Sequence, residues 1–440
     1  MSQRLRKLTV AGLFLVAAGL FAQSLSPAPD NPYYPPAGEW AHKKPAEVGM
    51  DAAKLAEAVS FMMSHETNQA RDFSDQEIMF GSLLGSVPTE RATTNGLIIR
   101  HGHIVSEFGD TMRPDPTYSV AKSMLSTVAG IALQRGLIPG LDDPVANSIK
   151  DGGYETPHNR LVTWRNHLQQ ESEWEGEMWG KNANFVRKEA FGNGEMKPRA
   201  IQAPGTQYEY NDVRINRFSL SLLELLKKPI PDVFRDEVMN PIGASNTWNW
   251  VPYTNSYVMI DGKRMASVSG GTRWGGGVWI NSYDMARFGL LWLRRGKWGD
   301  RQIVPESYVK LATTASAHGP DYGFFWWLNT TGKEWPGSPA NSFEARGNGG
   351  NIIYIDPAND LVVVWRWSLG SSQGVQKSRR VDCQVSQGWS ICTPRAPLKF
   401  STYSLQRKLP SLMLDRPAQP FVTRAVCLKT PHQGARTVSQ

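Results

Sequence analysis

A serine and a lysine three residues apart, Ser119 and Lys122, are the pair in this chain best suited to chemistry. They begin an amphipathic stretch that predicts a helix over residues 119–134, ended by Gly136. Residues three apart share one face of a helix, so the lysine amine would lie beside the serine hydroxyl. A serine hydroxyl is a poor nucleophile until a neighbouring group accepts its proton. The pair therefore predicts a nucleophilic serine, although Ser-x-x-Lys alone is common by chance.

Three further segments follow in the chain. Residues 204–212 read Pro-Gly-Thr-Gln-Tyr-Glu-Tyr-Asn-Asp, which places Tyr210 two residues before Asp212. Residues 347–352 read Gly-Asn-Gly-Gly-Asn-Ile. Between them, Gly-Gly-Gly-Val-Trp at 275–279 precedes Asp-Met-Ala-Arg-Phe at 284–288. Several motifs in a fixed order are much more specific than any one of them.

In this order, the motifs resemble those of the class C β-lactamase-like serine hydrolases, with which family VIII esterases and 6-aminohexanoate-dimer hydrolases are grouped. The resemblance covers roughly residues 51–367. It implies a serine hydrolase that acts on esters or amides through an acyl-enzyme intermediate. Ser119 is then the nucleophile, Lys122 its neighbouring amine, and Tyr210 the carrier of a proton between Ser119 and the leaving group.

The resemblance also implies an oxyanion hole formed by the backbone N–H groups of Ser119 and Asn351. Gly349 and Gly350 precede the second donor, and glycine allows the backbone to approach a neighbour closely. We expect these two glycines to line the substrate pocket. Of the many tryptophans, Trp174 and Trp179 are the candidates for pocket lining, and the others are expected in the core.

Two positions depart from the family pattern. Asp212 stands where β-lactamases have asparagine, and a carboxylate there favours a protonated Lys122, which moves the base role toward Tyr210. The alternative is a structural role, in which Asp212 caps the helix that runs to residue 228; this role is compatible with an effect on Lys122. Asn348 stands where the family has a cation, so neutral esters or amides are expected as substrates.

Other functions stay open alongside esterase or amidase activity. One is D-Ala-D-Ala carboxypeptidase or β-lactamase activity, and another is a non-catalytic protein of the same fold that binds peptidoglycan or a partner. Residues 370–374 match the Gly-x-Ser-x-Gly nucleophile elbow, but no convincing helix follows them. The histidines show no metal-ligand spacing, so neither a metal nor a cofactor is expected.

The charge of the chain is concentrated at one end. The net charge is +8, but residues 369–440 alone hold 11 Lys/Arg and 2 Asp/Glu together with all three cysteines. The remainder is free of cysteine, so it needs no disulfide framework. It is also nearly neutral, so it lacks the basic surface typical of nucleic-acid-binding proteins. We expect residues 369–440 to be a disordered basic extension or the product of a frameshift, in place of the helix that covers the sheet in the family.

The predicted fold is α/β: an antiparallel sheet flanked by helices, with a large and mostly helical insertion. Helical spacing is found at 51–66, 213–228 and 283–295, and a hairpin is expected at 95–109. Strands are expected at 323–328, 351–355 and 361–367. The hydrolase domain is placed at 51–368, with a sheet lobe at 51–118 and 270–368 and a helical lobe at 119–269.

The N-terminus predicts export. Basic residues precede an apolar stretch at 8–22 that is short for a membrane span, so residues 1–24 are interpreted as a signal peptide and 25–50 as a Pro-rich tether. We expect a periplasmic or secreted protein, with a retained N-terminal anchor as the alternative. The expected partner is a small ester, amide or peptide substrate, with no stable membrane span after signal removal.

Overall fold

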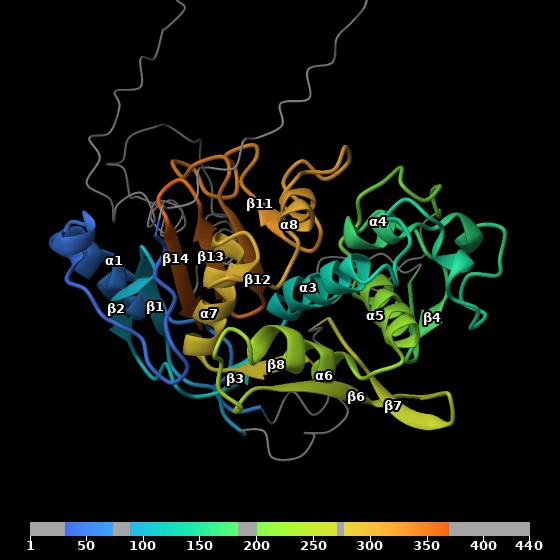
Figure 1. Ribbon diagram of the computed structural model, residues 1–440, viewed down its shortest axis with the longest axis horizontal. Helices are drawn as coiled ribbons and strands as arrows, with labels where there is room; N and C mark the ends of the chain where they lie inside the picture. The colour runs from blue at the N-terminus through green and yellow to red at the C-terminus, as the bar shows by residue number, and fades with distance from the viewer. Residues whose placement is uncertain (1–30, 74–88, 184–199, 271–276, 369–440) are drawn as a thin grey trace, which may run out of the picture.

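A six-stranded antiparallel sheet forms the centre of the molecule (Figure 1). The computed structural model describes residues 31–73, 89–183, 200–270 and 277–368. In spatial order the strands are β11 (Trp327–Leu328), β12 (Phe343–Gly347), β13 (Asn351–Asp356), β14 (Leu361–Arg366), β1 (Asn95–Arg100) and β2 (His103–Phe108). The early hairpin β1–β2 thus lies beside the last strands, and β1 pairs with β14 from Asn95 opposite Arg366 onward.

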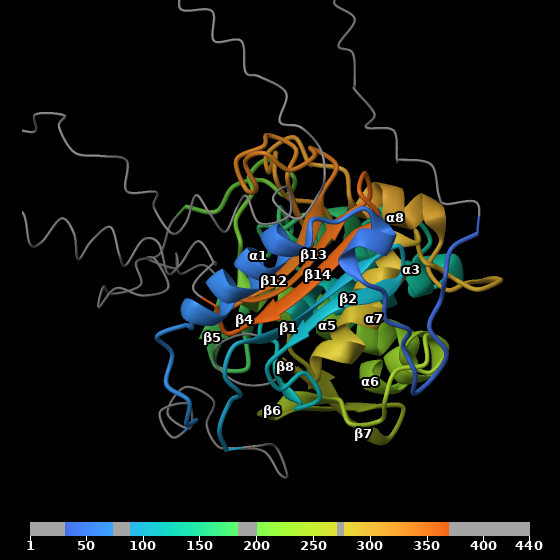
Figure 2. The same ribbon diagram turned by 90° about the vertical axis from the view of Figure 1, so that its left-hand side faces the viewer.

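Helices cover both faces of this sheet. On one face lies α1 (Ala52–Ser64), and on the other α7 (Ser282–Leu293), as Figure 2 shows from the side. Alternate residues of a strand point to opposite faces, so Ile353 and Val362 pack toward α7 while Ile352 and Val363 pack toward α1. Burial on both faces explains why β13 and β14 are continuous apolar runs.

A second, four-stranded antiparallel sheet was not expected. Its strands are, in spatial order, β3 (Asp115–Pro116), β8 (Gly277–Ile280), β6 (Asn249–Ile260) and β7 (Lys263–Val268). The hairpin β6–β7 belongs to the segment 119–269, so the predicted helical insertion also contributes two strands to this sheet. Pro252 and a register shift between Pro252 and Tyr257 interrupt the regular alternation from which a strand is recognised in sequence.

The rest of the described chain consists of short elements and loops around two long helices. They are α3 (Val120–Gln134) and α5 (Asp212–Leu226). The short elements are η1 (Pro45–Val48), η2 (Val145–Asn147), η3 (Asn159–Leu161), α4 (Trp164–Leu168), β4 (Glu177–Met178), β5 (Lys181–Asn182), α6 (Ile230–Phe234), η4 (Arg235–Met239), β9 (Lys297–Trp298), β10 (Arg301–Gln302) and α8 (Glu306–Ala312). Between α3 and α5, the described residues 141–183 and 200–211 contain short helices, the small hairpin β4–β5 and loops.

The predicted helix after Ser119 is confirmed as α3 (Val120–Gln134), which is buried on all sides from Val120 to Ala132. It contacts β12 of the main sheet, β8 of the second sheet, and α5, α6 and α8. A helix buried all round lies between other layers of the molecule. The first residues of α3 therefore lie where the two sheets and α5 meet.

The predicted helices and strands at 51–66, 95–109, 213–228, 283–295, 351–355 and 361–367 are confirmed within a few residues. The strand expected over 323–328 is wrong in its first part, because only β11 is a strand there. Gly323 N–H donates to the carbonyl oxygen of Trp326, and Phe325 has a φ of 60°, so these residues form a tight turn.

The Pro-rich segment interpreted as a tether packs on the domain over its described part. Trp40 Nε1 donates to the carbonyl oxygen of Gly102, the ring of Tyr33 stacks on His103 at 4.2 Å, and Arg287 donates to the carbonyl oxygens of Pro35 and others in this segment. Residues 33–50 therefore form part of the folded body.

Several predicted features lie outside the described residues. They are the signal peptide at 1–24, the first part of the glycine-rich motif at 275–279, the Gly-x-Ser-x-Gly match at 370–374 and the basic tail at 369–440. Their assignments stay predictions, as does the cellular location. Within the described ranges, no helix combines the length and hydrophobicity needed to cross a bilayer.

Candidate active site

Ser119 lies at the N-cap of α3 and is partly exposed, whereas Val120 and the turn after it are fully buried. The preceding residue, Tyr118, has a φ of 51°, a left-handed conformation that is uncommon for a non-glycine residue. Thr117 N–H donates to the carbonyl oxygen of Val278 at 2.8 Å and ties this turn to β8. The nucleophile candidate is thus held on a sharp strand-to-helix turn.

Lys122 is buried beside Ser119 and has three acceptors. Its Nζ atom lies 2.6 Å from Ser119 Oγ, 3.0 Å from the carbonyl oxygen of Gly270 and 2.9 Å from Asp212 Oδ1. Lys122 and Asp212 are 1% and 3% exposed. An ammonium has three protons to donate, and a neutral amine has two. The three acceptors, one of them a carboxylate, therefore suit a charged Lys122.

Asp212 does not cap its helix, contrary to the alternative drawn from the sequence. The cap is Asn211, whose side chain accepts from the N–H groups of Val213 and Arg214. Asp212 is the first residue of α5, and its carboxylate points to Lys122. The sequence correctly predicted the charge pairing, and it assigned the cap to the wrong member of the Asn-Asp pair.

Tyr210 lies next to this ion pair. Lys122 Nζ is 5.1 Å from the centre of the Tyr210 ring. The ring stacks on Trp327 with centroids 5.5 Å apart and meets Tyr322 edge-on at 6.1 Å. The structure thus brings Ser119, Lys122, Tyr210 and Asp212 together, which the spacing of their motifs in the chain does not by itself require.

The third motif forms the turn between β12 and β13. Gly347 pairs with Asn351 across the hairpin, and the Asn351 side chain donates to the carbonyl oxygen of Asn348 at 2.7 Å. A Cβ atom on Gly347 would lie 1.9 Å from the carbonyl oxygen of Thr117 and 3.2 Å from Ser119 N. Only glycine allows this approach, so the turn packs directly against the backbone that carries Ser119.

The backbone conformation and close packing of Gly349 and Gly350 explain why both positions are glycine. Both have a φ of 78°, and a Cβ atom on Gly350 would lie 1.8 Å from the carbonyl oxygen of Ser368. A Cβ atom on Gly349 would lie 2.7 Å from the ring of Trp367. Both are buried against the end of β14, and their predicted role in lining a pocket stays a prediction.

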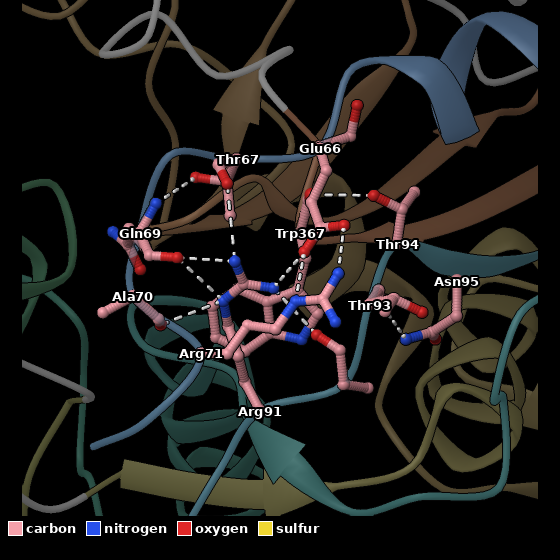
Figure 3. A network of polar contacts seen from close by, with 12 residues as sticks. Glu66, Thr67, Gln69, Ala70, Arg71, Arg91, Thr93, Thr94, Asn95 and Trp367 are labelled. Carbon is pink, nitrogen blue, oxygen red and sulfur yellow. Dashed lines mark hydrogen bonds and ion pairs between the residues drawn. The ribbon is translucent and has the colours of Figure 1, made fainter. Parts of the chain in front are cut away.

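The buried side chain of Arg91 contacts Gln69 and Trp367, the residues that pack against Gly349 (Figure 3). Its guanidinium pairs with Glu66 at 2.7 Å, donates to the carbonyl oxygen of Gln69 and lies 5.0 Å from the ring of Trp367. Thr94 Oγ donates to the carbonyl oxygen of Trp367 at 3.0 Å. These contacts fix the residues against which the glycine turn packs.

Trp174 and Trp179, the two tryptophans predicted to line the pocket, are in different surroundings. Trp174 is 3% exposed, and its Nε1 donates to the carbonyl oxygen of Gly153 at 2.7 Å, with Arg217 over its ring. It therefore packs inside the insertion, which argues against the predicted pocket role. Trp179 is half-buried, and its carbonyl oxygen accepts from Asn255. Its role in substrate binding stays a prediction.

Sequence reasoning missed four residues that shape the site. The carbonyl oxygen of Gly270 accepts from Lys122, and Tyr322 and Trp327 hold the ring of Tyr210. Gln170 accepts from Asn211 N–H and donates to Tyr322 Oη, which joins the tyrosine motif to this aromatic pair. Burial and the nearby Tyr210 raise the pKa of Tyr322, so its hydroxyl stays neutral. None of the four belongs to a motif.

No group of three or more His, Cys, Asp or Glu side chains in the described part of the chain is arranged to hold a metal ion.

Comparison with known proteins points to one family. The family model described as Beta-lactamase matches residues 98–381, which includes all the motifs above and extends past Ser368. An uncharacterized protein of Alkalihalophilus pseudofirmus is 24% identical over 280 residues, which is 58% of this chain and 74% of that protein.

Solved structures of other proteins are also similar to this chain. A candidate β-lactamase from Bacteroides dorei is 15% identical, with 74% of this chain and 94% of that chain covered and a TM-score of 0.50. A candidate 6-aminohexanoate-dimer hydrolase from Bacillus anthracis is 16% identical, with 75% and 93% covered and a TM-score of 0.45. At these identities the likeness concerns the fold alone.

Proposed function

This chain belongs to the β-lactamase family, and we propose that it is a serine hydrolase that cleaves neutral esters or amides through an acyl-enzyme on Ser119. Members of this family are mostly serine hydrolases. The observation that carries the proposal is the buried contact of Lys122 with Ser119 Oγ at 2.6 Å and with Asp212 at 2.9 Å. It places a nucleophile candidate, a proton-donating neighbour and a charge partner at one partly exposed helix end.

In the proposed first step, Ser119 Oγ attacks the acyl carbon and the bond to the leaving group breaks. The serine proton passes to the alcohol or amine that leaves. Tyr210 carries this proton, because the three acceptors around Lys122, which include the Asp212 carboxylate, favour its charged form. Lys122 then supports the reaction by its charge and by its hydrogen bond to Ser119. Water hydrolyses the acyl-enzyme in the second step by the reverse proton path.

The negative oxygen that develops on the substrate needs preorganised donors. We propose the backbone N–H groups of Ser119 and Asn351 for this role, as the family resemblance implies. The close approach of Gly347 to Ser119 N supports it, because it brings the β12–β13 turn against the start of α3. A single oxyanion-hole donor contributes about 3 to 4 kcal/mol to the transition state.

The preference for neutral substrates follows from the charges around the turn. Asn348 is uncharged, and the nearby Arg346 is engaged by two carboxylates, Glu334 at 2.7 Å and Glu344. The guanidinium also lies over the ring of Trp327, which stacks on Tyr210. A substrate carboxylate would have to compete with both glutamates for this cation. This supports neutral esters or amides over β-lactams and D-Ala-D-Ala peptides.

A fluorophosphonate probe tests the proposal, since it phosphonylates activated serines. Intact mass should show one adduct on the wild-type chain and none on Ser119→Ala. Ser123→Ala is the matched control, because Ser123 lies one turn later on α3 and its buried hydroxyl donates to the carbonyl oxygen of Phe325. An adduct on Ser119→Ala would refute the assignment of the nucleophile, and no adduct on the wild type would favour a binding protein of the same fold.

A further inference from the structure

Arg366, the last residue of β14, is fully buried and joins three segments of the chain. Its Nε donates to Asn351 Oδ1 at 2.8 Å, its Nη2 to the carbonyl oxygen of Pro116 at 2.9 Å, and its Nη1 to the carbonyl oxygen of Ile280 at 2.5 Å. A guanidinium offers its donors in one rigid plane, so it fixes the relative positions of its acceptors.

Two of these acceptors lead directly to the candidate site. Asn351 begins β13, and its own side-chain N–H donates to the carbonyl oxygen of Asn348, which closes the glycine turn. Pro116 ends β3, three residues before Ser119. The third acceptor, Ile280, ends β8, the strand that pairs with β3. One side chain therefore spans from the turn of the third motif to the segment that carries the serine.

We propose that Arg366 is a positioning residue that sets the spacing between the backbone N–H groups of Ser119 and Asn351. The inference rests on the proposed function, in which these two groups form the oxyanion hole. Arg366 touches neither the substrate nor the reacting atoms. It acts through the Asn351 side chain on one donor and through the Pro116 carbonyl on the other.

The charge of Arg366 is balanced inside the protein. Burial lowers the pKa of Arg366 to about 10, and the nearby Asp115 acts in the opposite direction, so the guanidinium is charged at neutral pH. Asp115 is itself fully buried and accepts from Ala92 N–H and Trp367 Nε1, both at 2.8 Å. A neutral replacement of Arg366 would remove a cation that favours the ionised Asp115, leaving Arg113, whose Nε lies 3.7 Å from Asp115 Oδ1. Arg366→Lys keeps the charge and removes the planar fork, so it is the sharper variant.

The test compares an ester with its thionoester, in which sulfur replaces the carbonyl oxygen. Sulfur is larger and a weaker hydrogen-bond acceptor, so a well-formed oxyanion hole favours the oxygen substrate. We expect Arg366→Lys to lower kcat on the oxygen ester about tenfold or more, with little change in KM. On the thionoester the loss should be smaller, so the ratio of the two rates falls.

Arg287→Lys is the matched control. Arg287 lies on α7, is 3% exposed and donates to the carbonyl oxygens of Ile242, Pro36 and others, none of which belongs to the candidate site. Its replacement should lower the melting temperature and leave the oxygen-to-sulfur ratio unchanged. Rates are expressed per active site counted by fluorophosphonate labelling, so unfolded molecules do not enter the comparison.

Asn351→Ala provides a second route if Arg366→Lys does not fold. It keeps Arg366 and the backbone N–H of residue 351 and removes the acceptor that links them. The same fall in the ratio is expected. One contrary result is that the wild type shows Ser119-dependent turnover while the folded variants keep its oxygen-to-sulfur rate ratio. That result would overturn the positioning role and leave the proposed function in place. No Ser119-dependent turnover in the wild type would overturn this role and the proposed function together.

Discussion

The candidate site joins two regions that are built in different ways. The side-chain half, formed by Ser119, Lys122, Tyr210 and Asp212, depends on an ammonium with three acceptors and on an aromatic ring beside it. The turn half, residues 347–351, is proposed to act through a backbone N–H donor, and it carries no charged side chain. Its geometry depends on glycines that only fit without a Cβ atom.

Because of this difference, substitutions in the two halves should have different effects on stability and turnover. In the side-chain half, a substitution removes a proton carrier or breaks a buried ion pair. In the turn half, a substitution displaces a backbone donor and leaves every charge in place. The two halves can therefore be separated by measuring stability and turnover on the same variants.

The largest effects are expected in the side-chain half. Tyr210→Phe should lower kcat by about 10² to 10⁴-fold, because it removes the proposed proton carrier, and should leave the melting temperature nearly unchanged. Lys122→Ala should lower kcat by no more than that. It should also cost about 3–5 kcal/mol of stability, because the buried Asp212 carboxylate loses its ion pair with Lys122.

Lys122→Ala combined with Asp212→Ala is the control for this prediction. Removing both charges should restore part of the stability that Lys122→Ala loses, without restoring turnover. Near-normal kcat in Tyr210→Phe would end the assignment of Tyr210 as proton carrier, and would return the base role to Lys122.

In the turn half, Gly347→Ala should lower kcat by roughly 100-fold, because the new Cβ atom would lie 1.9 Å from the carbonyl oxygen of Thr117 and push the turn away from Ser119. Gly332→Ala is the control, since Gly332 has a φ of 70° and open space around it. It should cost about 1 kcal/mol of stability at unchanged kcat. Equal kinetic effects of the two substitutions would show that the close approach at Gly347 has no bearing on catalysis.

The smallest effect concerns the missing cation of the turn half. The wild type should hydrolyse p-nitrophenyl butyrate with a higher kcat/KM than nitrocefin, which carries a carboxylate. Asn348→Lys should shift the ratio of the two values toward nitrocefin by roughly threefold to tenfold. A clear preference of the wild type for nitrocefin would contradict the neutral-substrate proposal.

The sequence predicted the side-chain half well, because its residues belong to motifs whose side chains carry the chemistry. Ser119 and Lys122 share a helical face by their spacing, and the charge of Asp212 suggested its pairing with Lys122. The main sheet was also predictable, since β13 and β14 are unbroken apolar runs.

The second sheet and the supports of the site could not be predicted in the same way. The hairpin β6–β7 is interrupted at Pro252, so its alternation is weak. Trp327 and Tyr322 contact Tyr210 from more than 100 residues away, and Arg366 reaches Pro116 across 250 residues. Such contacts depend on tertiary packing, which spacing along the chain does not encode. Asn211 and Asp212 are both good cap residues, so local propensity could not choose between them.

The most direct test of the central claim is to trap the acyl-enzyme during turnover. Wild-type protein is mixed with p-nitrophenyl butyrate, quenched in acid within the first turnovers and measured by intact mass and peptide mapping. The account predicts a mass gain of one butyryl group on the peptide that contains Ser119, formed together with a burst of p-nitrophenol. Turnover with no covalent intermediate, or a butyryl group on any other residue, would contradict it.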